Sequence, residues 1–308
     1  MKHLSILLRL RKDNGFLFYG LLIVATILLV AALADSLPLA DPLEVQQIRP
    51  NPNGGFSWPP FSPSADFRLG SDALGRDLLS RVIHGARLTL GLAMAVAAIR
   101  LILGFVTGML ASFAPEWFRD ALDLMVQTSS GLPALIVAVI VLVTVRPWNH
   151  GMTTSVVWFI GVLSMLEWPR IADLINRRVE GLLARPFVEA AVAMGCSRWE
   201  LLFRHLLPHL LPTMAISFVV EMARALLIMG QLAIFNAFVG GTSVFQNYRD
   251  ELFVATKHPE WGTMLSQSWM YLFRRSWVPL VPAVAFFVTI LGFNMLGEGL
   301  RRHWEGIK

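Results

Sequence analysis

The chain of 308 residues is poor in cysteine and in charged residues. Its single cysteine, Cys196, excludes an internal disulfide framework. Only 15% of the residues are Asp, Glu, Lys or Arg, whereas 55% are hydrophobic and the mean hydropathy is +0.59. Soluble domains carry roughly 25% charged residues, so this composition indicates an all-α polytopic membrane protein.

Motifs of common nucleotide and metal sites are also absent. The sequence has no G-x-x-x-x-G-K-[ST] loop to cradle phosphates, no H-E-x-x-H and no Cys/His cluster to bind zinc. We therefore expect no catalytic residues and no metal site. The net charge of +5 is spread over the loops, which indicates membrane topology rather than nucleic-acid binding. Asp123, Glu167 and Asp173 lie near predicted span ends, where we expect a topological role.

Long apolar runs predict about six membrane-spanning helices. Fourteen of the 26 lysines and arginines lie in four segments: the N-terminus, a short turn at 116–120, the basic stretch that begins with Arg170 at the end of the fourth run, and the C-terminal tail. This bias places both termini in the cytoplasm. The first run resembles a secretory signal, but its length and the later spans favour an uncleaved helix. The runs lie at about residues 16–34, 88–112, 121–145, 154–171, 213–235 and 277–296.

The first long outer segment, residues 35–87, is rich in Pro, Gly and Ser in its middle, which argues against regular structure there. It ends in an amphipathic helix at about residues 78–87, expected to lie at the membrane interface. Ser71 or Asp72 can cap this helix.

Glycines and prolines inside the spans carry further expectations. Gly104 and Gly108 are spaced to let another helix approach the second span closely. Gly131 and Pro133 are expected to kink the third span.

Two arginines fall inside the predicted spans. Arg100 lies near the middle of the second span, and Arg224 lies in the fifth span beside Glu221. An arginine at this depth costs several kcal/mol unless it reaches a counter-charge or water. Glu221 either pairs with Arg100 between helices or pairs only with Arg224 one turn along its own helix, and the sequence leaves both alternatives open.

The segment RPFVEAAVAMGCSRWELLFRHLLP, residues 185–208, predicts two short helices joined at a corner. Pro186 suits a first helical position, and Gly195 suits the left-handed residue that ends the first helix. Ser197 and Glu200 have the S-x-x-E spacing of a capping box, which starts the second helix. A rigid corner of this kind moves the attached spans as one body.

The same segment resembles the E-A-A loop of ABC importer permeases, which docks on the cytoplasmic ATPase in that family. The E-A-A, the Gly and the Leu-Pro are in register, while His205 stands where the family usually has isoleucine. An ordinary helical hairpin is the alternative. The residues for which the resemblance implies ATPase coupling are Glu189, Ala190, Ala191, Gly195, Ser197, Glu200, Leu207 and Pro208.

A second set of motifs resembles the dipeptide, oligopeptide and nickel permease family. LGSDALGRDLLSRVIHGAR at 69–87 is similar to the LGTDxxGRDxxSRxxxGAR segment of the C-type subunit. Residues 259–265 and 294–301 resemble its P-x-WG-x-ML and N-x-LG-x-GLR stretches. At 234–241, IFNAFVGG replaces LSFLGLG, and an insertion-like run follows at 242–258. The outer-loop motif residues, for which capping and packing alone are an equal alternative, are Gly70, Asp72, Gly75, Arg76 and Asp77.

The resemblance covers about residues 16–301. It implies an ABC type I importer permease fold in the cytoplasmic (inner) membrane of a prokaryote, with peptides or a nickel chelate as cargo. The implied partners are a B-type permease, two cytoplasmic ATPases that bind ATP and Mg²⁺, an extracytoplasmic solute-binding protein and membrane lipid. This chain itself is expected to bind no cofactor and to be no enzyme. We expect an N-terminal region at 1–87, a permease core at 88–300 and a tail at 301–308.

Two other classes of protein stay open. Ion-coupled secondary transporters commonly have inverted repeats and helices broken at the midplane, and no repeat of fixed period is evident here. Uptake driven by an ion gradient without ATPase partners would favour that class. A membrane scaffold subunit without a pathway would instead purify without an ATPase and show no solute phenotype on deletion.

Overall fold

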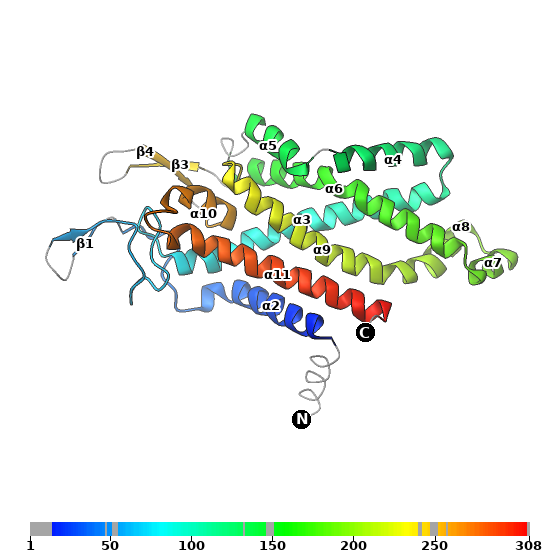
Figure 1. Cartoon of the computed structure of the whole chain (residues 1–308), viewed down its shortest axis with the longest axis horizontal. Coiled ribbons are helices and arrows are strands. Elements are labelled where there is room, and N and C mark those ends of the chain that lie inside the picture. Colours follow the sequence, from blue (N-terminus) through cyan, green and yellow to red (C-terminus); the bar gives the residue numbers. More distant parts are fainter. Residues whose placement is uncertain are drawn as a thin grey trace, which may run out of the picture.

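The computed structural model describes residues 14–46, 48–50, 55–131, 133–145, 151–239, 242–246, 252–256 and 258–306. Long helices run side by side along the longest axis of the molecule (Figure 1). The helices are α2 (Gly15–Ala32), α3 (Leu78–Phe113), α4 (Glu116–Gly131), α5 (Ala134–Val145), α6 (Met152–Leu183), α7 (Pro186–Ala193), α8 (Arg198–Glu200), α9 (Leu207–Ile234), α10 (Trp261–Ser268) and α11 (Trp277–Glu305). The strands are β1 (Arg49–Pro50), β2 (Phe56–Ser57), β3 (Thr242–Gln246) and β4 (Leu252–Thr256).

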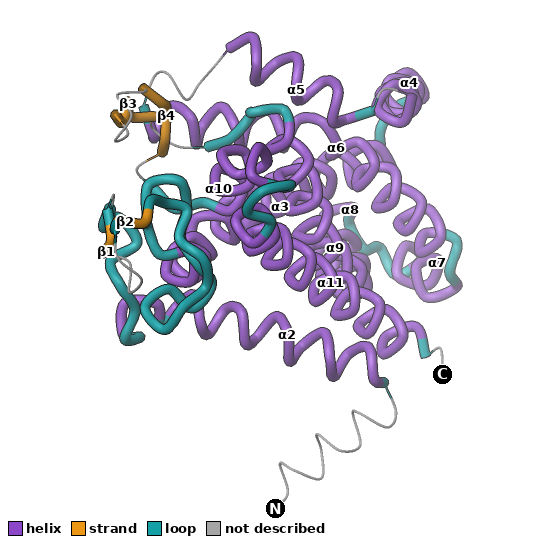
Figure 2. Tube along the Cα trace, turned by 60° about the vertical axis from the view of Figure 1, so that its left-hand side comes forward, coloured by secondary structure: helices purple, strands orange, loops and turns teal. Residues whose placement is uncertain are grey.

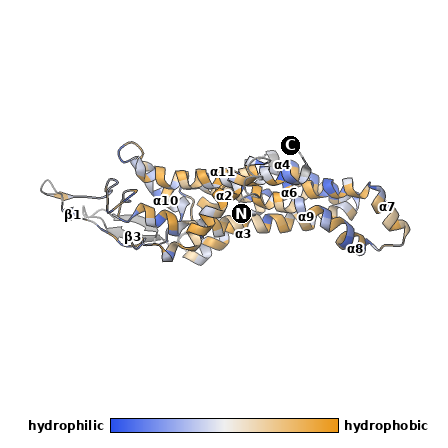
Figure 3. Ribbon diagram, turned by 90° about the horizontal axis from the view of Figure 1, so that it is seen from below, coloured by the Kyte–Doolittle hydropathy of each residue, from blue (hydrophilic) through white to orange (hydrophobic). Residues whose placement is uncertain are grey.

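Five of the described helices are long and apolar enough to cross a membrane, and the bent pair α4 and α5 brings the total up to six. Apolar residues dominate the long helices (Figure 3). The all-α polytopic fold is therefore confirmed. α4 and α5 meet at a bend of 82° beside Gly131 and Pro133, where the sequence predicts a kink. Proline explains the break, because it lacks the N–H that would continue the helical hydrogen bonds.

α3 differs from the sequence expectation in its length and in its cap. The predicted interface helix at 78–87 and the second span form one continuous helix of 36 residues, because no helix-breaking residue separates them. Neither Ser71 nor Asp72 caps α3. The carboxylate of Asp77 does so, accepting a hydrogen bond from the Ser80 N–H at 2.9 Å.

Other helices also run past their predicted ends. The turn expected at 116–120 lies inside α4, and Ala114 and Pro115 connect α3 to α4 instead. α6 passes through Pro169 and continues to the corner. α11 extends beyond the predicted sixth span, so part of the expected tail is helical.

Loops and short elements collect at the two ends of the bundle. One end carries both strand pairs and α10, whereas the other carries α7, α8 and the C-terminal end of α11 (Figures 1 and 2). The side chain of Asn14 donates to the Gly299 carbonyl at 2.7 Å, which places the start of α2 at this second end. The insertion-like run contains an antiparallel hairpin, in which Thr242 pairs with Thr256.

The helices of the bundle approach closely at glycines. A Cβ atom on Gly104 would lie 2.5 Å from Ile171 Cβ, and one on Gly108 would lie 2.4 Å from the Ala172 carbonyl oxygen. α3 and α6 therefore touch along their backbones, which confirms the close approach predicted from this spacing. The close contact brings the central residues of α6 next to Arg100 on α3.

Candidate functional site

The corner between α6 and α9 has two short helical segments, as the sequence predicts. α7 begins at Pro186, and Gly195 follows it with φ of +86°, a left-handed conformation that glycine adopts without strain. The Ser197 hydroxyl accepts a hydrogen bond from the Glu200 N–H at 3.2 Å. Half of the predicted capping box is therefore present. The Glu200 carboxylate instead lies 3.3 Å from Arg204 Nη1, one turn farther along.

The second helix of the corner continues into the fifth span. α8 leads into a π-helical turn, Leu201–Leu206, and then into α9, which makes one apolar helical path from Arg198 to Ile234. The wide turn ends at Leu206, two residues before Pro208. Because proline has no N–H and its ring clashes with the carbonyl four residues earlier, the wider turn fits here better than a regular α-turn. The corner is therefore joined to α9 without a break in the helical path.

The motif residues of the corner divide between packing and exposure. Ala191 is buried with Val188, and both contribute to an apolar cluster that also contains Leu206 and Leu210. Glu189 and Ala190 are exposed on α7. The cluster holds α7 against the ends of α6 and α9, so the corner is a packed unit.

The outer surface of the corner carries large exposed apolar side chains. Met194 is 81% exposed, Trp199 is 71% exposed and Phe203 is 59% exposed. The Trp199 and Phe203 rings stack with their centroids 6.0 Å apart. These three side chains give the corner an exposed apolar surface at the end of the bundle.

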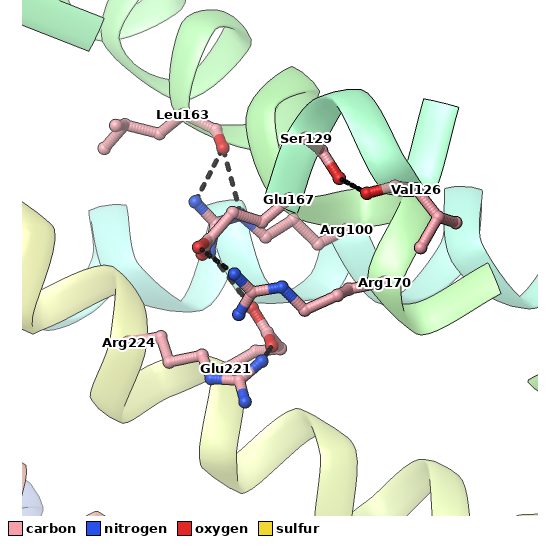
Figure 4. Close-up of polar contacts among 8 residues, drawn as sticks. All are labelled: Arg100, Val126, Ser129, Leu163, Glu167, Arg170, Glu221 and Arg224. Atoms are coloured by element: carbon pink, nitrogen blue, oxygen red, sulfur yellow. Dashed lines mark hydrogen bonds and ion pairs between the residues drawn. The ribbon is translucent and has the colours of Figure 1, made fainter. Parts of the chain in front are cut away.

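A second candidate site lies inside the bundle and is centred on Arg100 (Figure 4). Its side chain is fully buried, and Nη1 donates to Glu167 Oε2 at 2.8 Å and to Glu221 Oε2 at 3.0 Å. Nε and Nη2 donate to the Leu163 carbonyl at 3.0 and 2.7 Å. One guanidinium thus connects α3, α6 and α9.

Each glutamate also holds a second arginine. Arg170 Nη2 lies 3.3 Å from Glu167 Oε1, and Arg224 Nη1 lies 2.7 Å from Glu221 Oε1. The five side chains form an alternating row, here called the ion-pair row, with two negative and three positive charges (Figure 4). Glu221 pairs with Arg100 between helices and also with Arg224 on its own helix, so the alternative in which it pairs only with Arg224 is wrong.

Glu167 is the member of the ion-pair row that sequence reasoning missed. The sequence places it at a span end, but α6 continues from Met152 to Leu183, so Glu167 lies at the middle of the helix. The topological role expected for it is therefore wrong. One feature of the sequence could have indicated its role. A buried Arg100 needs more than one hydrogen-bond acceptor, so a second carboxylate beside Glu221 is to be expected.

The outer-loop motif residues build a tight turn before α3. The Asp72 carboxylate accepts hydrogen bonds from the Leu74 and Arg76 N–H groups at 2.9 and 3.0 Å, and from Arg76 Nε at 2.7 Å. It also lies 3.5 Å from Arg81 Nε. Both oxygens of the Asp72 carboxylate are therefore occupied by contacts within this chain.

The glycines of this motif allow the turn to form and to pack. Gly70 and Gly75 have φ of +79° and +80°. A Cβ atom on Gly75 would lie 1.9 Å from the Gln46 carbonyl oxygen, so no other residue fits without moving the chain. The geometry supports the packing alternative for the motif. Among the described residues, no group of three or more His, Cys, Asp or Glu side chains is arranged to hold a metal ion.

Comparison with known proteins places this architecture in a family. Residues 100–305, which include the ion-pair row and the corner, match the family described as the binding-protein-dependent transport system inner membrane component. The chain belongs to this family. The ABC importer permease that the motifs indicate is thereby confirmed.

Several curated relatives of this permease are similar over most of their length. The dipeptide transport system permease protein DppC of Alkalihalophilus pseudofirmus is 26% identical over 94% of this chain and 85% of the relative. The di/tripeptide permease DppC of Pseudomonas aeruginosa is 31% identical over 77% of this chain and 71% of the relative. The glutathione permease GsiD of Pectobacterium atrosepticum is 28% identical over 78% of this chain and 72% of the relative.

The comparisons agree with the C-type assignment made from the outer-loop motif. This permease is a multi-pass membrane protein that works with other components of an ABC importer.

Proposed function

We propose that this chain is the C-type permease subunit of an ATP-driven importer that carries peptides across the cytoplasmic membrane. Its relatives are named for dipeptides, di- and tripeptides and glutathione, which are all short peptides. The proposed partners are a B-type permease, two cytoplasmic ATPase subunits that bind ATP and Mg²⁺, and an extracytoplasmic solute-binding protein.

The observation that carries this proposal is the corner, a packed helical unit with an apolar outer surface and direct continuity into α6 and α9. Met194, Trp199 and Phe203 supply the exposed apolar side chains with which the corner would contact an ATPase subunit. When the ATPases close on ATP, the corner moves, and α6 and α9 move with it as rigid bodies. The ion-pair row extends the motion to α3, because Arg100 holds both helices.

The proposed orientation puts the corner in the cytoplasm. The start of α2 and the end of α11 lie toward the end of the bundle that carries the corner (Figure 1), which supports a cytoplasmic location for both termini. The opposite end, with α10 and the β3–β4 hairpin, then faces the solute-binding protein. Basic residues on α6 near the corner support this orientation through the positive-inside rule.

A test of the proposal uses the complete importer and substitutions confined to the corner. Gly195→Asp and Glu189→Lys each change the charge of the surface proposed to contact the ATPase. Gly195→Asp also places a side chain on a residue whose φ is +86°, a conformation that favours glycine. We expect ATP hydrolysis to continue while peptide uptake is lost, with normal amounts of the permease in the membrane.

Gly306→Asp is the matched control. Gly306 also has a left-handed φ, +66°, and open space around it, and it lies at the same end of the molecule but outside the corner. It should leave uptake and its coupling to hydrolysis unchanged. Normal, ATP-coupled uptake in both corner variants would contradict the proposed function.

A further inference from the structure

We propose that Arg170 and Arg224, the two ends of the ion-pair row, form a site in the transport pathway that binds the carboxylate of the passing peptide. This inference rests on the proposed function, because it names the chemical group of the peptide that the permease contacts. The site is assigned from the burial, position and charge of the row.

The first step is the position of the two arginines. Arg224 lies near the middle of the predicted fifth span, and Arg170, although it is at the end of the predicted fourth span, lies at the level of the buried Arg100, because Glu167 contacts both arginines. Their side chains are 42% and 41% exposed, whereas Arg100 between them is fully buried. A guanidinium half exposed to hydrocarbon at this depth costs several kcal/mol. The face of the bundle that carries both arginines therefore belongs to the water-filled pathway between this chain and the proposed B-type permease rather than to the lipid-facing surface.

The second step is the charge of the row. Three arginines alternate with two glutamates, so the row carries one uncompensated positive charge in the middle of the membrane. One oxygen of Glu167 and one oxygen of Glu221 contact the buried Arg100. The other oxygen of each glutamate contacts the arginine at its end of the row. One further carboxylate would balance the row.

The third step is the hydrogen-bonding capacity of the ends. A guanidinium has five N–H donors, and among the described residues the structure gives Arg170 and Arg224 one ion pair each. Both groups therefore retain donors that point away from their glutamates. Arginine binds carboxylates through paired N–H donors, and every peptide with a free C-terminus carries such a carboxylate.

The site also lies where binding can respond to ATP. α6 leads into the corner and α9 leads out of it, so movement of the corner changes how Arg170 and Arg224 face each other. Because each arginine already neutralises a glutamate, the hold on a peptide carboxylate is weak. A pathway site has to be weak in this sense, since the cargo must also leave it.

Whether this face is aqueous can be tested without measuring transport. In a Cys196→Ala background of the complete importer, Leu227→Cys places a thiol one turn beyond Arg224, at a position that is 48% exposed. Phe287→Cys on α11, 65% exposed, is the matched control for a lipid-facing thiol. We expect a charged, membrane-impermeant methanethiosulfonate reagent to modify Leu227→Cys and to spare Phe287→Cys. Equal rates at the two positions would overturn the assignment of a water-lined face.

Carboxylate recognition is tested by uptake of one dipeptide as its free acid and as its C-terminal amide, each normalised to the occupancy of the solute-binding protein. The Arg170→Gln/Arg224→Gln variant should lose about tenfold or more in free-acid uptake and little in amide uptake. Arg170→Lys/Arg224→Lys keeps the charges and should retain most of the free-acid uptake. Arg177→Gln, an exposed arginine of α6 paired with Asp173, should change neither.

The outcomes separate the two proposals. Unchanged free-acid uptake in the Gln variant, or equal loss for the acid and the amide, would overturn the carboxylate site while peptide import stands. Absence of any peptide uptake by the unaltered importer would overturn the proposed function, and the carboxylate assignment with it. Copurification of the ATPase subunits with the Gln variant shows that an uptake defect is not a failure of assembly.

Discussion

Arg100 on α3 and Glu221 on α9 lie 3.0 Å apart inside the bundle, although 121 positions separate them in the chain. Glu167 on α6 shares the same guanidinium nitrogen at 2.8 Å. In water such contacts contribute little, but in a buried site the loss of one partner leaves the others as uncompensated charges. The ion-pair row therefore determines how three spans are held together.

Removal of Arg100 should destabilise the protein strongly. In Arg100→Leu, Glu167 and Glu221 lose the cation that they share, and breaking a buried pair of this kind costs about 3–5 kcal/mol. We expect a clearly lower thermal unfolding midpoint for the purified permease in detergent. Arg177→Leu removes an exposed arginine of the same α6 and should leave the midpoint unchanged.

A compensated variant tests the charge explanation. Arg100→Leu combined with Glu167→Gln and Glu221→Gln removes the uncompensated carboxylates, so part of the lost stability should return. If Arg100→Leu alone leaves assembly and transport intact, the three helices are not held by the row.

The backbone contact between α3 and α6 should not tolerate a methyl group. A Cβ atom on Gly108 would lie 2.4 Å from the Ala172 carbonyl oxygen, which belongs to a helix backbone and cannot rotate away. Gly108→Ala should therefore cost about 1–3 kcal/mol, as overpacking does in other cores. The measurement is thermal unfolding in detergent.

Gly91 offers the control within the same helix. Nothing lies within 4 Å of a Cβ atom at this position, and alanine is the better helix former by about 1 kcal/mol. Gly91→Ala should be neutral or stabilising. A loss of stability in Gly91→Ala equal to that in Gly108→Ala would show that the helix contact is not the cause.

Cys196 at the corner should react slowly with thiol reagents at neutral pH. Burial, and next the charge of Glu200, raise the pKa of the Cys196 thiol above its ordinary value. Less of the reactive thiolate is therefore present at a given pH, and the rate of alkylation should rise only at higher pH than for an ordinary cysteine. The measurement is the alkylation rate of the intact permease between pH 7 and about 10, the range that spans ordinary thiol titration.

Met194→Cys in a Cys196→Ala background is the comparison, because Met194 is 81% exposed on the same corner. The alkylation rate of the thiol in Met194→Cys should begin to rise at a lower pH than the alkylation rate of Cys196. Glu200→Gln should move the profile of Cys196 partly toward that of the exposed thiol. A profile for Cys196 identical to that of Met194→Cys would contradict the stated cause.

Glu260 should be needed to hold α10 against α3. Its buried carboxylate accepts hydrogen bonds from Gly262 N at 2.8 Å, Thr263 N at 2.7 Å and Thr89 Oγ1 at 3.2 Å. In Glu260→Gln, an amide NH₂ would face one of these donors, at a cost of about 1–3 kcal/mol. We expect faster hydrogen exchange at the Gly262 and Thr263 amides.

Glu44→Gln is the control for this substitution, since Glu44 is exposed in the first outer segment. Exchange in α10 should be unaffected by it. Unchanged exchange in Glu260→Gln would mean that Trp261, whose indole N–H donates to the Val82 carbonyl at 2.8 Å, suffices to dock α10.

The sequence by itself determined the helical, membrane-spanning character of this protein and the form of its corner. These features depend on local signals, namely the length of apolar runs, a proline at the first position of a helix, a glycine at its end and a serine at the next helix start. Pro186, Gly195 and Ser197 act within one or two turns, so neighbouring residues suffice to predict their effect.

Only the tertiary structure decided which buried charges meet. The pairing of Arg100 with Glu167 depends on where α6 ends, on the axial offset of α3 against α6 and on the rotation of both helices about their axes. A sequence pattern contains none of these quantities, because they follow from side-chain packing between distant segments, such as Gly104 against Ile171. For the same reason the packing role of Asp72, and the exposure of Arg170 and Arg224 along one row, required the folded chain.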